Sequence, residues 1–151
     1  MKLKGLSVVE LNKIYARGRG PKATELLDDS DSHLDYGPAE WRVDMLTGPI
    51  PNLSSWPFHH RKRFWFSMNR VIGHNAFFKN MRWGWFKVVH ASVPSWTVIN
   101  YHQPENGKFI RNICDFICTT DDSNIMLGQF YYEMGSRTFG PYYFSLTRIE
   151  K

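Results

Sequence analysis

The chain has 151 residues, of which 42% are hydrophobic and 16% aromatic, and this composition excludes a disordered chain, a coiled coil and a collagen-like repeat. Its formal net charge of +5 predicts a mildly basic surface. No apolar run approaches the roughly 18 residues that a membrane-spanning helix needs, and the N-terminus lacks the apolar core of a secretory signal. We therefore expect a soluble, cytoplasmic protein without a membrane span.

The N-terminal segment predicts two short helices. Ser7 and Glu10 have the spacing of a capping box, and an apolar stripe of helical period follows them. Either Gly18 or Gly20 is expected to end this helix. A second helix is predicted over residues 23–27.

From Tyr36 onward the sequence predicts strands. Short runs rich in Trp, Phe, Tyr, Val and Ile alternate with clusters of Gly, Pro, Asn and Asp. Such runs close most simply into an antiparallel up-and-down barrel of about eight strands, because closure leaves no exposed edge. We predict a mainly β single domain, with residues 1–35 as a helical flank and residues 36–151 as the barrel. The predicted strands are residues 40–47, 62–69, 75–78, 83–91, 97–102, 108–119, 125–134 and 142–149.

An eight-strand barrel has room to enclose one small ligand. Along residues 110–118, the face with Asn112, Cys114 and Phe116 mixes apolar and small polar side chains, so we expect it to face inward. The leading hypothesis is therefore binding of a small hydrophobic molecule inside the barrel, with the N-terminal helix plugging or flanking one mouth. The predicted ligand-binding residues are Trp41, Phe64, Phe66, Trp83, Trp85, Tyr101, Asn112, Cys114, Phe116, Phe130 and Tyr132.

The two ends of the predicted barrel resemble lipocalin-like proteins. In those barrels a Gly-x-Trp begins the first strand, and an Arg of the last strand stacks on that tryptophan; here Gly37 precedes Trp41, and Arg148 ends Phe-Ser-Leu-Thr-Arg. The chain is similar to a poorly characterised lipocalin-like family named for a Gly-x-Trp-x-Gly signature, a signature that is not intact here. The resemblance implies a small barrel for an apolar ligand and a structural role for Trp41 and Arg148, whose stacking would contribute roughly 0.5 to 2 kcal/mol. Further matching segments are Lys62-Arg63-Phe64, residues 101–104, Asp115 and Leu127-Gly128.

An enzyme on the same barrel is the first alternative. Asp115 and Tyr101 lie on neighbouring predicted strands and form a candidate pair for proton transfer, and His74 is a third candidate. These residues would serve an isomerase or a cyclase acting on a small apolar substrate without a metal. A plain cross-strand hydrogen bond is the competing interpretation. Motifs of hydrolases, nucleotidases and dehydrogenases do not occur in the sequence.

The histidines and cysteines predict neither a metal site nor a cofactor. The six histidines form no His-x-His or His-Glu-x-x-His pattern, and haem on a barrel histidine is the one cofactor left open. Cys114 and Cys118 are too far apart along a strand to form a disulfide, so we expect buried free thiols.

A nucleic-acid-binding module is the second alternative. Residues 45–104 contain no Asp or Glu, yet they carry seven Lys and Arg residues and five of the six tryptophans. Lys and Arg residues interleaved with aromatic residues are typical of surfaces that bind single-stranded nucleic acid. The competing interpretation is that the aromatic residues fill the core and the Lys and Arg residues lie on the solvated outer face of the strands. The oligomeric state is left open.

Overall fold

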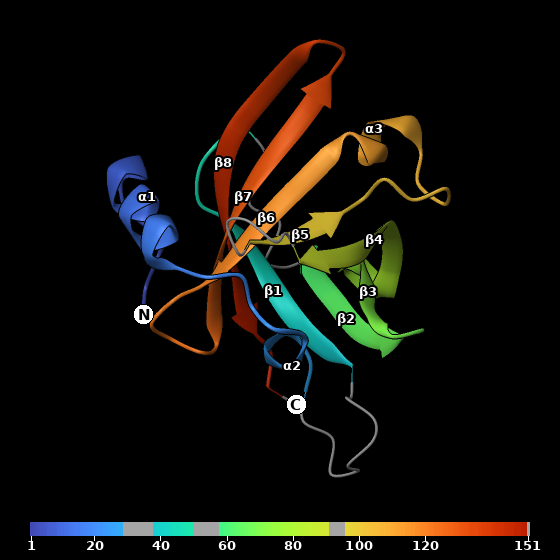
Figure 1. The fold of residues 1–151 in the computed structure, drawn as a ribbon, viewed down its shortest axis with the longest axis horizontal. Coiled ribbons are helices and arrows are strands. Elements are labelled where there is room, and N and C mark those ends of the chain that lie inside the picture. The colour runs from blue at the N-terminus through green and yellow to red at the C-terminus, as the bar shows by residue number, and fades with distance from the viewer. Residues whose placement is uncertain (29–37, 50–57, 91–95, 151) are drawn as a thin grey trace.

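The computed structural model describes residues 1–28, 38–49, 58–90 and 96–150. Eight antiparallel strands each pair with the next in sequence, and β8 pairs back onto β1 to close a barrel (Figure 1). The predicted mainly β barrel with a short N-terminal helix is therefore confirmed. The elements are α1 (Val8–Arg17), α2 (Ala23–Leu26), β1 (Ala39–Met45), β2 (Arg61–Ser67), β3 (Arg70–Phe77), the 3₁₀ helix η1 (Phe78–Asn80), β4 (Met81–His90), β5 (Thr97–Asn100), α3 (Lys108–Arg111), β6 (Ile113–Thr119), β7 (Ile125–Met134) and β8 (Arg137–Arg148).

The starts of three strands, β3, β6 and β8, differ from the predicted ones by five residues. The predicted strands 62–69 and 75–78 left His74 between strands, but His74 lies inside β3, and the chain instead turns at Met68 and Asn69, which both have positive φ. The first four residues of the predicted strand 108–119 form α3. Arg111 holds that turn in place, because its Nε atom donates to the carbonyl oxygens of Gln103 (3.1 Å) and Asn106 (2.7 Å).

Aromatic rings fill the deeper half of the barrel. Phe64 and Phe86 lie with their ring centroids 5.2 Å apart, and both are buried. The ring of Phe144 lies against Gly128, where a Cβ atom would stand only 2.1 Å from the ring. A glycine is required there, because any side chain would displace Phe144 from the core.

Trp41 and Arg148 close the end of the barrel where β1 begins. The guanidinium carbon of Arg148 lies 4.5 Å from the centre of the Trp41 ring, the contact that the resemblance to lipocalin-like proteins implied. Arg148 also donates to the carbonyl oxygen of Leu27 (3.1 Å) and pairs with Asp28 (2.9 Å). The indole nitrogen of Trp41 donates to the carbonyl oxygen of Leu26 at 3.0 Å.

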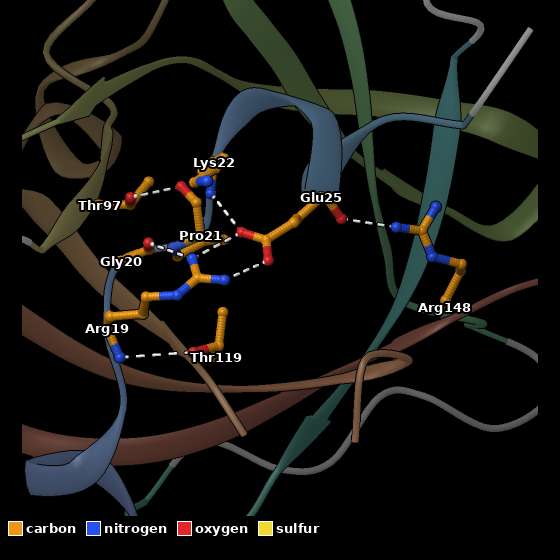
Figure 2. A network of polar contacts seen from close by, with 8 residues as sticks. All are labelled: Arg19, Gly20, Pro21, Lys22, Glu25, Thr97, Thr119 and Arg148. Carbon is orange, nitrogen blue, oxygen red and sulfur yellow. Dashed lines mark hydrogen bonds and ion pairs between the residues drawn. The ribbon is translucent and has the colours of Figure 1, made fainter. Parts of the chain in front are cut away.

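The segment from Arg19 to Glu25 is tied across this closed end (Figure 2). The Arg19 side chain pairs with Glu25, and the Thr97 hydroxyl donates to the Pro21 carbonyl oxygen at 3.0 Å. Leu26 and Leu27 follow and pack into the interior core beneath Trp41. The end of the barrel is therefore plugged by α2 and its flanks.

Helix α1 lies outside the barrel (Figure 1). Its predicted capping box is present, with Ser7 Oγ accepting from the Glu10 amide, and Gly18 ends the helix. Leu11 and Tyr15 pack on the outer face of the sheet. The helix expected to plug or flank a mouth therefore covers the outer wall instead, and α2 with its flanks plugs the closed end. No helix within the described ranges has the length and apolar character needed to cross a membrane.

Candidate functional site

A cavity of about 180 Å³ occupies the half of the barrel where β1 ends and β8 begins. Seven of its lining residues are apolar, and the five polar ones belong to β2, β3, β6 and the segments that adjoin β2 and β5. The apolar lining consists of Val43, Met45, Phe77, Trp83, Ile113, Phe130 and Phe144. The polar lining consists of His60, Lys62, Asn75, Tyr101 and Asp115.

A buried ion pair stands at the centre of the polar lining. Lys62 and Asp115 are each only 3% exposed, and the ammonium nitrogen lies 3.0 Å from Asp115 Oδ2. The other two Lys62 protons are directed to Asn75 Oδ1, at 3.0 Å, and to the Tyr101 hydroxyl. The ammonium group is therefore fully hydrogen-bonded, as a buried charge must be.

The remaining bonds join the same residues into one network. The Tyr101 hydroxyl donates to Asp115 Oδ2 at 3.1 Å and accepts from Asn75 Nδ2 at 3.2 Å. Both contacts to Asp115 use Oδ2, and Oδ1 has no hydrogen-bond partner among the described residues. Since Asp115 lines the cavity, Oδ1 is the acceptor that this network leaves for a bound molecule.

Burial shifts the proton affinities of these groups. Loss of solvation lowers the pKa of the Lys62 ammonium, and the adjacent Asp115 carboxylate acts in the opposite direction. Burial, reinforced by Asp115, raises the pKa of the Tyr101 hydroxyl well above its usual value. Tyr101 is therefore a permanent hydrogen-bond donor at neutral pH.

Three stacked rings form one wall of the cavity. The Phe77 ring lies 4.5 Å from His60 and 5.3 Å from Trp83, nearly parallel to both. His60 Nε2 lies 3.1 Å from Asn75 Oδ1, which makes it the donor because an amide oxygen only accepts. Burial lowers the pKa of His60 to about 3, with the Lys62 charge adding to the effect, so the ring is neutral.

The structure brings part of the predicted ligand-binding set to the cavity. Trp83, Tyr101 and Phe130 line it. Trp41, Phe64 and Tyr132 belong to the interior core without lining the cavity. Phe66, at the end of β2, is 45% exposed.

The predicted inward face of β6 is wrong. Ile113, Asp115 and Ile117 point inward, whereas Cys114 and Phe116 lie on the outer side, where Phe116 contacts Trp96 and Tyr131. The reason is that the α1 cluster covers this outer face, so both faces of the strand are largely apolar. Asn112 caps α3 and also does not line the cavity.

The assignments of Trp85 and His74 to the interior site are also wrong. Their rings lie 5.0 Å apart in an edge-on contact, and Trp65 contacts both of them from the adjacent β2. Asn75 faces inward by ordinary alternation with Phe77, whereas His74 faces outward. The register of β3 and β4 passes from His74–Trp85 to Asn75–Trp83, so Gly84 is the extra residue of a bulge that turns Trp83 inward while Trp85 faces outward. Of the three predicted catalytic residues, Tyr101 and Asp115 therefore meet and His74 does not.

Sequence reasoning missed three polar residues of the site: Lys62, Asn75 and His60. Lys62 is two positions from Phe64, so the alternation of a strand puts both on one face, and the core position of Phe64 was a usable signal. Asn75 was missed because it stood at the first position of the short predicted strand 75–78, whereas β3 begins at Arg70.

Residues 45–104, which contain no Asp or Glu, do not present all their Lys and Arg side chains to solvent. Arg61 and Arg63 both pair with Glu40 of β1, and Lys62 is buried against Asp115. Three of the seven bases that suggested a nucleic-acid surface are therefore neutralised by carboxylates outside the stretch.

The two cysteines are free, as predicted. Burial raises the pKa of Cys118 to about 12 and that of Cys114 to about 11, so neither thiol is activated.

Within the part of the chain that the structure describes, no three His, Cys, Asp or Glu side chains form a metal-binding group. Comparisons of the chain with protein-family models, with curated proteins and with solved structures found no match.

Proposed function

We propose that this chain binds one small, largely apolar molecule with a single polar group inside a lipocalin-like barrel. The observation that carries the proposal is the cavity of about 180 Å³, whose apolar walls surround one polar network. Apolar cavities of about 150 Å³ already bind benzene, so this one has room for a substituted aromatic ring. His60, Phe77 and Trp83, which stack on one another, give the lining aromatic groups that such a ring can contact.

The polar network sets the expected chemistry of the ligand. Lys62 and Asp115 neutralise each other, which favours an uncharged ligand. The free Asp115 Oδ1 accepts hydrogen bonds only, so the ligand should bring a donor such as a hydroxyl group. Benzyl alcohol combines a ring, a small volume and this donor.

Native mass spectrometry of the freshly purified chain, followed by denaturing extraction, would reveal a small molecule that accompanies it. Titration with benzyl alcohol then tests the cavity directly. We expect Met45→Trp, which fills the cavity, to weaken binding at least about tenfold. The matched variant Met134→Trp changes an exposed methionine and should bind as the unaltered chain does. Equal binding by both variants would place the ligand elsewhere.

Proton transfer is a second candidate function, favoured by the bond between Tyr101 and Asp115. In an isomerase or cyclase, Asp115 Oδ1 would accept a proton from the bound molecule while Tyr101 stays protonated. We expect Asp115→Asn to abolish turnover of the extracted molecule and to reduce its affinity far less. Parallel loss of turnover and affinity would assign Asp115 to binding alone.

A further inference from the structure

We propose that Lys62 forms an imine with small aromatic aldehydes that enter the barrel cavity. The inference rests on the proposed binding function and adds to it a nucleophile and a class of reactive ligand. It starts from the only lysine among the residues that line the described cavity.

Lys62 can reach its neutral, nucleophilic form by giving a proton to Asp115. Before that transfer it is an ammonium ion, whose nitrogen lies 5.0 Å from the ring centre of Tyr101 and 5.6 Å from those of Phe86 and Phe144, contacts that favour the charge. Among described groups, Asp115 is the one carboxylate in contact with it. Passing one proton from Lys62 to Asp115 therefore removes both buried charges together, and a desolvated amine is the form that attacks a carbonyl group.

Asp115 supplies the proton transfers that imine formation needs, while Tyr101 stays protonated. The neutral Lys62 nitrogen attacks the aldehyde carbon, a C–N bond forms, and the carbonyl oxygen takes the proton held by Asp115. The nitrogen then returns a proton to the Asp115 carboxylate. Asp115 passes that proton to the hydroxyl group as the C–O bond breaks, and water leaves. One amine, one aldehyde and the Asp115 proton thus give one water and a protonated imine, which stays paired with the Asp115 carboxylate, without an oxidant or reductant.

Lys62, Asp115 and Tyr101 lie close enough together for these steps. Asp115 Oδ2 is already 3.0 Å from the Lys62 nitrogen and is the atom that takes up the lysine proton. The same oxygen can give that proton to the aldehyde oxygen, which is bonded to the carbon that the nitrogen attacks. The Tyr101 hydroxyl bonds to both Lys62 and Asp115 and holds them together. The aldehyde's ring would lie against Phe77 and His60 of the cavity lining.

Reductive trapping tests the proposal on the unaltered chain. The protein is incubated with benzaldehyde and sodium cyanoborohydride at neutral pH, and the benzylated lysines are located by peptide mass spectrometry. We expect labelling of Lys62 to exceed that of the exposed Lys87 and Lys108 by at least about tenfold, because the cavity holds the aldehyde beside the amine. Asp115→Asn should slow labelling of Lys62 and leave labelling of Lys87 unchanged.

A parallel titration with benzyl alcohol separates the two proposals. If benzyl alcohol binds in the cavity and Lys62 is labelled no faster than Lys87, the imine proposal is overturned and the binding function stands. If benzyl alcohol does not bind and Lys62 is not labelled, both proposals fail. Selective labelling that excess benzyl alcohol suppresses supports both.

Discussion

At the scale of single residues, the interior of this barrel is unusual in enclosing a charged pair. A buried pair contributes little net stability compared with apolar residues of the same shape, because desolvation offsets the attraction between its charges. The Lys62–Asp115 pair nevertheless forms hydrogen bonds with Asn75 and Tyr101. Such an arrangement in a cavity wall fits a functional role better than a purely structural one.

Removing one partner of this pair should cost far more than removing both. Asp115→Asn leaves the Lys62 ammonium without its counter-charge, and we expect a loss of about 3 to 5 kcal/mol in the free energy of unfolding. The double variant Lys62→Met with Asp115→Leu leaves no buried charge and should lose less than half as much. Urea unfolding of both variants measures the difference. A double variant as unstable as the single one would show that packing, not charge, sets the cost.

His60 should make stability depend on pH. The folded protein holds the pKa of His60 at about 3, whereas its ordinary value is 6.5, so the unfolded chain takes up the extra proton between these values. The contribution of neutral His60 to the free energy of unfolding is therefore fully present above pH 6.5. It is lost as the pH falls toward 3, by about 1.4 kcal/mol per pH unit. His60→Gln retains a donor for Asn75 and removes the titrating group.

The measurement is the free energy of unfolding in urea at pH 7 and at pH 5. We expect the unaltered chain to lose about 2 kcal/mol more than His60→Gln over this interval, since the carboxylates affect both proteins alike. Equal losses would mean that water reaches the His60 ring and keeps its pKa near the ordinary value.

At the scale of elements, the junction between α1 and β6 depends on close approach. A Cβ atom on Gly18 would lie 2.6 Å from the Thr119 carbonyl oxygen and 2.7 Å from Cys118 Sγ. The backbone of Gly18 is ordinary for any residue, with φ at −70°, so only this contact excludes a side chain. The end of the helix is thereby held against the sheet.

Gly18→Ala should consequently destabilise the chain by about 1 to 3 kcal/mol, the usual cost of overpacking. Gly107→Ala is the matched control, because a Cβ atom there meets nothing within 4 Å; as an N-cap change it should cost less than about 1 kcal/mol. Thermal unfolding of the two variants compares them. If Gly18→Ala were as stable as the control, the helix end would have to move away from β6 at little cost.

The elements also show which features a sequence can predict. Alternation and turn residues identified the barrel, and the resemblance to lipocalin-like proteins implied the contact between Trp41 and Arg148. The inward face of β6 could not be predicted, because a helix distant in sequence buries the other face. The bulge at Gly84 is equally hard to predict, and it places Trp83 in the site while Trp85 lies outside it. Both failures concern which side chains of a strand point into the barrel, and tertiary contacts decide that.

At the scale of the whole molecule, the barrel wall joins two separate cores. The inner core includes Ile117, Met126 and Leu146, and the outer cluster under α1 includes Cys118, Leu127 and Tyr143, each the chain neighbour or near neighbour of an inner residue. Strands β6, β7 and β8 therefore cannot lose their inner packing without also losing the surface on which α1 rests. This arrangement predicts one cooperative unit.

A ligand in the cavity should accordingly protect a helix that it never touches. Benzyl alcohol at a hundred times its Kd stabilises the folded state by about 2.7 kcal/mol, which slows exchange through global unfolding about 100-fold. We expect this slowing at the amide of Ile99 in the barrel and equally at the amide of Leu11, which bonds to the Ser7 carbonyl oxygen at 3.0 Å. Hydrogen exchange followed by NMR measures both sites. Protection confined to Ile99 would mean that α1 opens independently of the barrel, and that the wall does not couple the two cores.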